Sequence, residues 1–360
     1  MQSQSLIRAV VDAAALRHNL QQVRRVAPQS RVMAVIKANA YGHGMVPAAK
    51  ALADADGFAV ARLGEGLALR AAGLTNRILL LEGVFNAEQL AAAAQARFEL
   101  MVHSAEQLEL LEALSGDTQV TAWIKIDSGM NRLGFRLEDF AEAYARLRRN
   151  RHVHADPTLV THLASADDRR APQTKQQLEA FSAATAGLAG ARSIANSAGV
   201  LAWPGARADW VRPGLMLYGV SPFPSGTGAE LGLRPAMTLC TEVIAIKHVR
   251  AGETVGYGGA WTAPRDTRMA VVAAGYGDGY PRMSGAGTPV LVNGRRAALV
   301  GRVSMDMLTV DVTDVPAVAV GDPVVLWGSE IPVEEVAAHA KAIAWDLLCG
   351  VSQRVPVEFG

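Results

Sequence analysis

The sequence predicts an α/β fold, with an N-terminal (β/α)8 barrel followed by a mostly-β domain. Eight short apolar runs alternate with helix-like stretches over the first two-thirds of the chain, which is the pattern of parallel strands joined by helices. Beyond about residue 230, β-branched runs broken by glycine turns such as VNGR take over. Between the two lies SPFPSGTGAELG (221–232), whose Gly, Pro and Ser content is typical of a linker.

The predicted barrel strands are the apolar runs at 31–38, 57–63, 77–83, 98–103, 119–127, 158–165, 192–197 and 210–219. The predicted helices lie at 45–55, 63–73, 86–96, 104–115 and 138–150. Eight strands in this alternation favour a closed barrel over an open doubly wound sheet. The turn after the first strand also lacks the G-x-G-x-x-G that is typical of that alternative.

The predicted β domain contains strands within 236–249, 267–279, 288–312 and 322–328, and one helix at 332–348. We therefore expect a barrel domain over residues 1–229 and a mostly-β domain over residues 230–360. No internal repeat and no low-complexity tract interrupts this division.

Composition excludes several classes of function. The chain has 360 residues, of which 50% are hydrophobic and 19% charged, and its net charge of +1 gives no electrostatic footprint for nucleic acid or an anionic membrane. Cys240 and Cys349 have no partner at metal-ligand spacing, so we expect neither a metal site nor a disulfide framework. The first residues do not resemble a signal peptide, and no apolar run reaches transmembrane length, so we expect a cytoplasmic protein.

Polar residues recur where the predicted strands end, and in a barrel of this kind that edge carries the active site. They are Lys37, Arg62, Glu82, His103, Lys125, His162, Asn196, Ser197 and Arg212. Ser197, Gly214 and Leu215 follow the seventh and eighth strands, where barrels often hold a phosphate. A strand-end lysine facing a phosphate site suits an aldehyde cofactor held as a Schiff base, namely pyridoxal 5'-phosphate.

Seven motifs then occur in a recognisable order. They are AVIKANAYGHG, KIDSGMNRLGF, THLASAD, WVRPGLMLYGVSP, VGYGGAW, GYGDGYPR and GRVSMDM. With these motifs, covering nearly the whole chain, the sequence resembles the bacterial alanine racemase family. The resemblance implies a pyridoxal-phosphate barrel followed by a β domain, working as a homodimer with shared active sites.

The resemblance also implies roles for individual residues. Lys37 would bond to the cofactor and act as one catalytic base, and Tyr257 of the partner chain would be the second base. Arg212 would face the pyridine nitrogen, with His162 between it and Tyr257. The remaining cofactor contacts would come from Tyr41, Asn196, Ser197, Gly214 and Leu215. A buried aromatic for Tyr257 and a satisfied core histidine for His162 remain the structural alternatives.

Substrate recognition follows from the same resemblance. Arg132 and the backbone of Met305 would bind the substrate carboxylate. Lys125 would be carbamylated, and its negative charge would orient Arg132. The entry channel would be lined by Tyr276, Arg282, Arg302, Asp306 and Asp167. Gln353 stands where some family members have a tyrosine that contacts the phosphate.

The predicted activity is interconversion of L-alanine and D-alanine by two bases. The alternatives that stay open are a racemase that also accepts serine, an amino-acid decarboxylase, and a pyridoxal-phosphate carrier without catalytic activity. Supply of D-alanine for peptidoglycan and catabolism of alanine are both compatible with the sequence.

Overall fold

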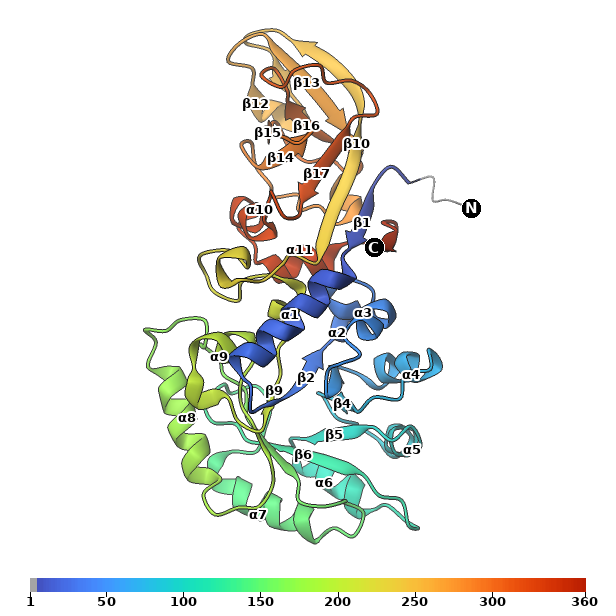
Figure 1. The fold of residues 1–360 in the computed structure, drawn as a ribbon, viewed down its shortest axis with the longest axis vertical. Coiled ribbons are helices and arrows are strands. Elements are labelled where there is room, and N and C mark those ends of the chain that lie inside the picture. The colour runs from blue at the N-terminus through green and yellow to red at the C-terminus, as the bar shows by residue number, and fades with distance from the viewer. Residues whose placement is uncertain (1–4) are drawn as a thin grey trace.

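A computed structural model describes residues 5–360, so the first four residues of the predicted domain 1–229 lie outside it. Figure 1 shows an elongated molecule with a barrel at one end and a β-rich part at the other. Helices α10 (Val333–Ala340) and α11 (Ala344–Gly350) lie between the two. No helix within the described residues combines the length and apolar character that crossing a bilayer requires.

The barrel is closed by eight parallel strands in sequence order, and β2 pairs with β9 to complete the ring. This confirms the predicted fold class. The strands are β2 (Arg31–Val35), β3 (Gly57–Val60), β4 (Ile78–Leu80), β5 (Glu99–Val102), β6 (Thr121–Lys125), β7 (Thr158–Val160), β8 (Arg192–Ser193) and β9 (Trp210–Val211). Most are shorter than predicted because polar loops begin soon after each buried run.

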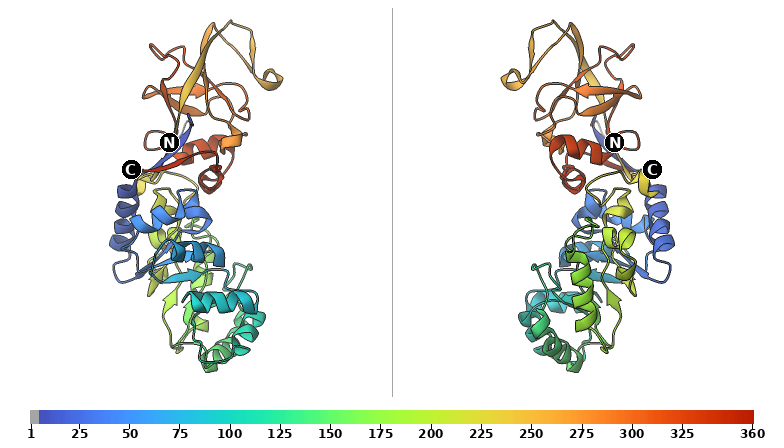
Figure 2. Two further views of the ribbon diagram at one scale, coloured as in Figure 1. Left: turned by 90° about the vertical axis from the view of Figure 1, so that its right-hand side faces the viewer. Right: turned by 90° about the vertical axis from the view of Figure 1, so that its left-hand side faces the viewer.

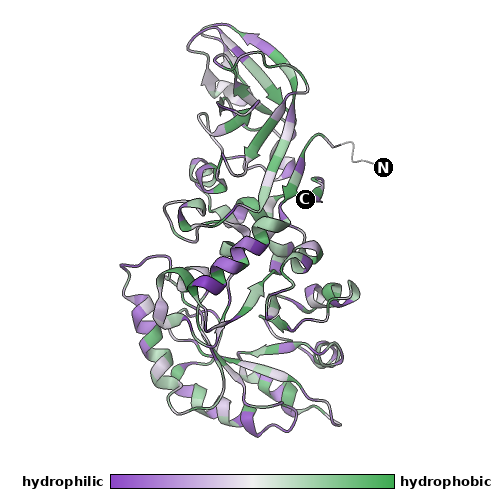
Figure 3. Ribbon diagram, in the orientation of Figure 1, coloured by the Kyte–Doolittle hydropathy of each residue, from purple (hydrophilic) through white to green (hydrophobic). Residues whose placement is uncertain are grey.

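Helices surround the barrel and turn one apolar face toward it. In α7 the buried residues Phe140, Ala143, Tyr144 and Leu147 recur at helical spacing, while the other faces are charged. Figure 3 shows this division of hydropathy along the outer helices. The helices are α1 (Ala13–Val26), α2 (Lys37–Tyr41), α3 (Met45–Ala51), α4 (Leu63–Ala71), α5 (Ala87–Gln95), α6 (Ala105–Glu112), α7 (Leu137–Arg149), α8 (Gln173–Ala184) and α9 (Ser197–Ala202).

Large side chains fill the barrel interior. Trp123 and Trp210 pack with ring centroids 5.5 Å apart, in a buried cluster with Met33, Leu79 and Met101. The indole N–H of Trp123 donates to the Glu99 carboxylate at 2.7 Å, so its buried polar atom is paired. The barrel is therefore a packed core and not a pore, which leaves its rim for a site.

The second part of the molecule is an eight-stranded sheet in the order β13-β16-β15-β14-β17-β10-β1-β18. The long strand β10 also pairs with β13, so six of the strands close on themselves around a second apolar core. The strands are β1 (Arg8–Val11), β10 (Met237–Val249), β13 (Thr267–Val272), β14 (Pro289–Val292), β15 (Arg295–Leu299), β16 (Leu308–Asp311), β17 (Pro323–Trp327) and β18 (Val357–Phe359).

The N-terminal strand β1 belongs to this second sheet and not to the barrel. It runs antiparallel to β10 and parallel to β18. Strand β1 was not predicted, because its four residues, RAVV, are too short to stand out beside the following helix. The division at 229/230 stays a prediction, with this one strand lying in the sheet formed by the later residues.

A small hairpin projects from the second sheet. It consists of β11 (Thr254–Val255), the 3-10 turn η4 (Tyr257–Gly259) and β12 (Trp261–Thr262). Figure 2 shows this segment extending away from the other strands. Tyr257 is thus carried on an arm and not within a packed layer.

The single helix predicted over 332–348 is wrong, because the segment forms two helices. The chain turns at Lys341, whose left-handed φ of 52° ends α10. Helix α11 then lies against α2 of the barrel, and the backbone of Leu348 approaches Gly42 closely. A Cβ on Gly42 would lie 2.0 Å from the Leu348 carbonyl oxygen, so glycine permits this contact. The contact joins the two parts beside Lys37.

Candidate active site

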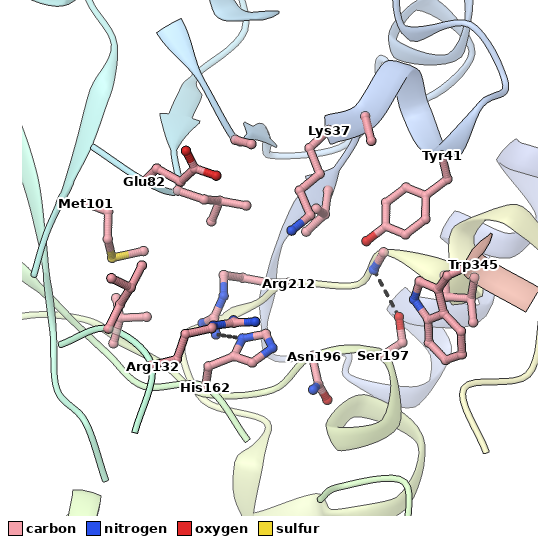
Figure 4. Close-up of a pocket in the computed structure, with 18 of the residues that line it drawn as sticks. Lys37, Tyr41, Glu82, Met101, Arg132, His162, Asn196, Ser197, Arg212 and Trp345 are labelled. Carbon is pink, nitrogen blue, oxygen red and sulfur yellow. Dashed lines mark hydrogen bonds between the residues drawn. The ribbon is translucent and has the colours of Figure 1, made fainter. Parts of the chain in front are cut away.

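A cavity of about 790 Å³ opens at the carboxyl ends of the barrel strands. Figure 4 shows the Lys37 amine and the Tyr41 hydroxyl pointing into it, with Arg212, His162 and Ser197 on the opposite side. The lining includes Lys37, Tyr41, Lys125, Arg132, His162, Asp167, Asn196, Ser197, Arg212, Gly214 and Leu215. Eleven residues predicted from separate segments of the sequence are therefore brought together in one cavity.

Lys37 enters the cavity from an unusual piece of backbone. Strand β2 ends at Val35, two residues earlier than a strand-end Lys37 requires, and Lys37 begins the short element α2. The next four residues, Ala38 to Tyr41, all have left-handed φ values of 52–55°. For residues with a Cβ this conformation costs about 1–2 kcal/mol each. The turn needs strong local support to persist.

Part of that support comes from His43, which is fully buried. Its Nδ1 lies 3.0 Å from the Ala40 carbonyl oxygen and 2.9 Å from that of Tyr41, so Nδ1 carries the hydrogen and donates to them. Burial lowers the pKa of His43 to about 4. His43 is therefore neutral, and its hydrogen bonds hold the turn in place.

Arg212 and His162 form a buried pair on the cavity wall. Nη2 of Arg212 lies 3.3 Å from Nδ1 of His162, and Arg212 also donates to the Thr161 carbonyl at 2.6 Å and the Ser193 hydroxyl at 2.5 Å. Burial lowers the pKa of Arg212 to about 10, which still leaves it protonated at neutral pH. Burial and the neighbouring positive charge of Arg212 hold the pKa of His162 well below its usual value.

Lys125 lies at the end of β6, only 7% exposed, and donates to the Leu133 carbonyl at 2.9 Å. Burial first, then the charges of Arg212 and Arg132, lower its pKa to about 8. Two cations facing a buried amine favour its neutral form or its conversion to an anion. A protonated Lys125 would therefore be repelled by the positive charges of Arg212 and Arg132.

Ser197, Tyr41 and Gly214 lie close together at one end of the cavity. The Ser197 Oγ accepts from the N–H of Gly214 at 3.0 Å and of Met216 at 3.3 Å. A Cβ on Gly214 would lie 2.4 Å from the Tyr41 hydroxyl oxygen. Burial raises the pKa of Tyr41, so its phenol stays protonated and able to donate. Leu215 lines this end of the cavity as well.

Asn196 lines the cavity, but its side chain is engaged in holding the local fold. Its Oδ1 accepts from Gly199 N at 2.9 Å as the cap of α9, and its Nδ2 donates to the Leu163 carbonyl at 3.3 Å. A direct cofactor contact from Asn196 stays a prediction.

The predicted site residues of the later sequence do not line this cavity. Tyr257, Tyr276 and Met305 are 71%, 39% and 53% exposed.

Several of these later residues lie together. The Arg282 guanidinium lies 5.9 Å from the Tyr276 ring centre, and the backbone N–H of Tyr276 donates to the Ser304 carbonyl at 3.0 Å. Arg302 lies beside the Tyr257 loop, since a Cβ on Gly258 would be 3.5 Å from its Nη1. Asp306 bonds Arg354 at 2.8 Å. We call these residues (Tyr257, Tyr276, Arg282, Arg302, Met305 and Asp306) the β-domain cluster.

Helix α11 also contributes to the lining of the cavity, which was not predicted from the sequence. Trp345 and Cys349 reach the cavity from α11. The two residues are four positions apart, about one helical turn, and nothing in the sequence indicated that this helix lies against α2. Gln353 is exposed and does not line the cavity.

Comparison with known proteins identifies the family. Residues 11–222 match the family model of the alanine racemase N-terminal domain, and residues 236–359 match that of the C-terminal domain. The chain belongs to the alanine racemase family. This confirms the predicted resemblance.

Full-length relatives agree with this assignment. The chain is 51% identical over 356 residues to the alanine racemase of Shewanella amazonensis, covering 97% of this chain and 98% of the relative. It is 53% identical over 349 residues to that of Nitrosococcus oceani, with the same coverage. The crystal structure of the biosynthetic alanine racemase of Pseudomonas aeruginosa superposes with a TM-score of 0.96 at 49% identity, covering 99% of this chain and 100% of that one.

Proposed function

We propose that the protein interconverts L-alanine and D-alanine with pyridoxal 5'-phosphate as its cofactor. The observation that carries this proposal is the meeting of Lys37, Arg212 and the Tyr41–Ser197–Gly214 group in one cavity of a racemase-family barrel. This cofactor requires a reactive amine at its aldehyde, a fixed cation at its ring and several hydrogen-bond donors at its phosphate.

The residues present fit the cofactor. Gly214 leaves room beside the Tyr41 hydroxyl that any side chain would fill. The Ser197 hydroxyl, the Tyr41 phenol and the backbone N–H of Leu215 would supply neutral donors, which suit a phosphate, and the N–H of Gly214 supports them by donating to Ser197 Oγ. Lys37 would hold the aldehyde covalently. Arg212 would donate to the ring nitrogen, because a guanidinium has donors and no acceptor.

The chemistry begins with a proton at Cα of the substrate. The cofactor, when bound, withdraws electrons from Cα and makes that proton removable. Lys37 would take or return the proton on one face. Tyr257 of the partner subunit would do the same on the other face. Two fixed bases on opposite faces exchange the configuration without rotating the substrate.

Neither base suits this work at its ordinary pKa of about 10. Arg212 is buried and charged, so it keeps His162 neutral, with the hydrogen on Nε2 because Nδ1 accepts from the guanidinium. His162 would then present an N–H toward the second base and stabilise its phenolate.

Arg132 and the backbone of Met305 would bind the substrate carboxylate. We also propose that Lys125 is carbamylated, and two observations support this. Its lowered pKa provides the neutral amine that reacts with carbon dioxide. The product anion would then pair with Arg132, whereas an ammonium would repel it.

We propose that Tyr257 reaches the cavity from a second copy of the chain. It is 71% exposed and carried on a projecting hairpin, outside the cavity of its own chain. In a two-fold dimer each cavity would receive the partner's β-domain cluster. Tyr276, Arg282, Arg302 and Asp306 would then form the entry channel together with Asp167, which already lines the cavity. A cytoplasmic location stays a prediction.

The test is to incubate the holoenzyme with L-alanine and follow optical rotation. Decay to zero without release of carbon dioxide supports a racemase. Release of carbon dioxide would indicate a decarboxylase, and an unchanged rotation would favour a carrier without catalytic activity. A parallel series with L-serine measures the breadth of specificity, since a hydroxyl added to a small substrate is only weakly rejected by an apolar pocket.

A further inference from the structure

The left-handed turn from Ala38 to Tyr41 separates two residues that the proposed chemistry needs. Lys37 immediately precedes it and Tyr41 closes it. None of the four residues is glycine, so the backbone conformation is not their own preference. Contacts from outside the turn must select it, and they thereby decide where the Lys37 amine and the Tyr41 phenol point.

Glu65 supplies the contact at the start of the turn. Its Oε1 accepts a hydrogen bond from the backbone N–H of Ala38 at 2.7 Å. Its Oε2 accepts from the N–H of Ala61 at 2.7 Å and of Arg62 at 3.2 Å. One carboxylate therefore joins the segment after β2 to the segment after β3 through bonds to a charged acceptor, which are stronger than neutral ones.

We propose that Glu65 is a positioning residue for Lys37, a role that rests on the proposed function. The N–H of Ala38 belongs to the peptide unit that follows the Lys37 Cα, so fixing its direction fixes the ψ angle of Lys37. The carboxylate holds the first left-handed residue in place, and His43 holds the carbonyls at the other end. With hydrogen bonds from Glu65 and His43 holding its two ends, the turn directs Lys37 into the cavity.

A purely structural role for Glu65 makes a different prediction. Glu65 lies in the first turn of α4 and its bond from Arg62 N is of the kind that caps a helix. If capping were its only role, loss of the carboxylate would loosen α4 and leave residues 37–44 unchanged. Hydrogen exchange of the two segments therefore separates the two roles.

The test compares Glu65→Gln with Glu88→Gln. The glutamine has the same size, but its amide N–H group must face backbone N–H donors at one end. Glu88 is an exposed glutamate in the first turn of α5 and serves as the matched control. Three quantities are measured: hydrogen exchange of the apoprotein, its affinity for pyridoxal 5'-phosphate, and kcat and KM for alanine.

We expect Glu65→Gln to speed exchange in residues 37–44 more than in α4 and to weaken cofactor binding. We also expect kcat to fall about 10- to 100-fold, as a misplaced reacting group does, with a smaller change in KM. Glu88→Gln should match the wild type. Faster exchange confined to α4, or unchanged exchange in 37–44, would overturn the proposal.

A second variant tests the mechanism through rescue. Glycine adopts left-handed φ without penalty, so Ala38→Gly should recover part of the kcat lost in Glu65→Gln. Ala68→Gly, at an exposed position within α4, should recover nothing. Equal recovery by both, or by neither, would contradict a role in holding the turn. If the wild type does not racemise alanine, the proposed function fails, and the exchange data still decide whether Glu65 holds the turn.

Discussion

The guanidinium of Arg212 donates to Nδ1 of His162 over 3.3 Å, deep in the cavity wall (Figure 4). A guanidinium cannot accept, so this contact assigns the hydrogen of the neutral His162 ring to Nε2. A protonated His162 would face Arg212 with like charge, and its lowered pKa agrees with this. The pair thus places a permanent cation and a neutral donor side by side.

Replacing this cation should change which reaction occurs. Arg212→Glu would let a carboxylate hold a proton on the cofactor ring nitrogen, and a protonated ring draws more charge away from Cα. We expect slower racemisation and more pyruvate from transamination. Pyruvate is measured by coupled lactate dehydrogenase, with Arg170→Glu as an exposed control. Unchanged pyruvate in a folded Arg212→Glu protein would contradict this role.

Lys125 should make stability depend on pH. Its folded pKa of about 8 lies below the unfolded value of about 10.4. The unfolded chain therefore binds more protons between these pH values, and stability should rise with pH across this window by up to about 3 kcal/mol. Below pH 8 the cost of burying the charge is fully present.

The measurement is urea unfolding at pH 7.5 and 10 in buffer free of carbon dioxide. Lys125→Met, which cannot titrate, should lack the gain seen in the wild type. An identical pH dependence in the two proteins would mean that burial of Lys125 does not carry this cost.

The proposed carbamate of Lys125 predicts chemical rescue. Lys125→Ala removes the anion beside Arg132, so activity should fall because the arginine is no longer oriented. Acetate or another small carboxylate should restore part of it, whereas chloride at equal ionic strength should not. Full activity of Lys125→Ala without any addition would show that no anion is needed there.

Two glycines give a matched pair for the contact between α2 and α11. Gly42 and Gly73 have nearly equal φ values of +81° and +82°, but only Gly42 faces a close backbone neighbour. Gly73→Ala should cost about 1–2 kcal/mol of conformational strain. Gly42→Ala should cost about 1–3 kcal/mol more because it also meets Leu348. If thermal unfolding shows that the two variants lose equal stability, the backbone contact between Gly42 and Leu348 can adjust at little cost in free energy.

Much of the barrel could be predicted because parallel strands and their helices leave strong patterns in sequence. Lys37, His162, Ser197 and Arg212 were found as polar residues after buried runs, and the barrel brings such ends to one rim. The order of the seven motifs then indicated which chemistry these residues carry out. These signals are local in sequence, so they survive without knowledge of the tertiary fold.

The features that were missed depend on tertiary contacts. The turn at Ala38–Tyr41 contains alanines and an asparagine, none of which signals four left-handed residues. Trp345 lines the cavity only because α11 lies against α2. Strand β1 finds its partners in β10 and β18, more than two hundred residues away. Sequence periodicity carries no information about such distant pairings.

We propose that each active site combines Lys37 of one chain with Tyr257 of the other. Lys37→Ala and Tyr257→Phe homodimers each lack one base in both sites, so both should be nearly inactive. A mixed dimer would have one site with both lesions and one with neither. Random exchange makes half of the dimers mixed, so about a quarter of wild-type activity should return.

The most direct measurement is therefore racemase activity after the two inactive variants exchange subunits, with exchange verified by native mass spectrometry. Activity should rise with the fraction of mixed dimers, reach about a quarter of the wild-type value, and fail to rise if the homodimers are cross-linked first. If mixed dimers form and no activity returns, Lys37 and Tyr257 act within one chain and the shared-site account is wrong.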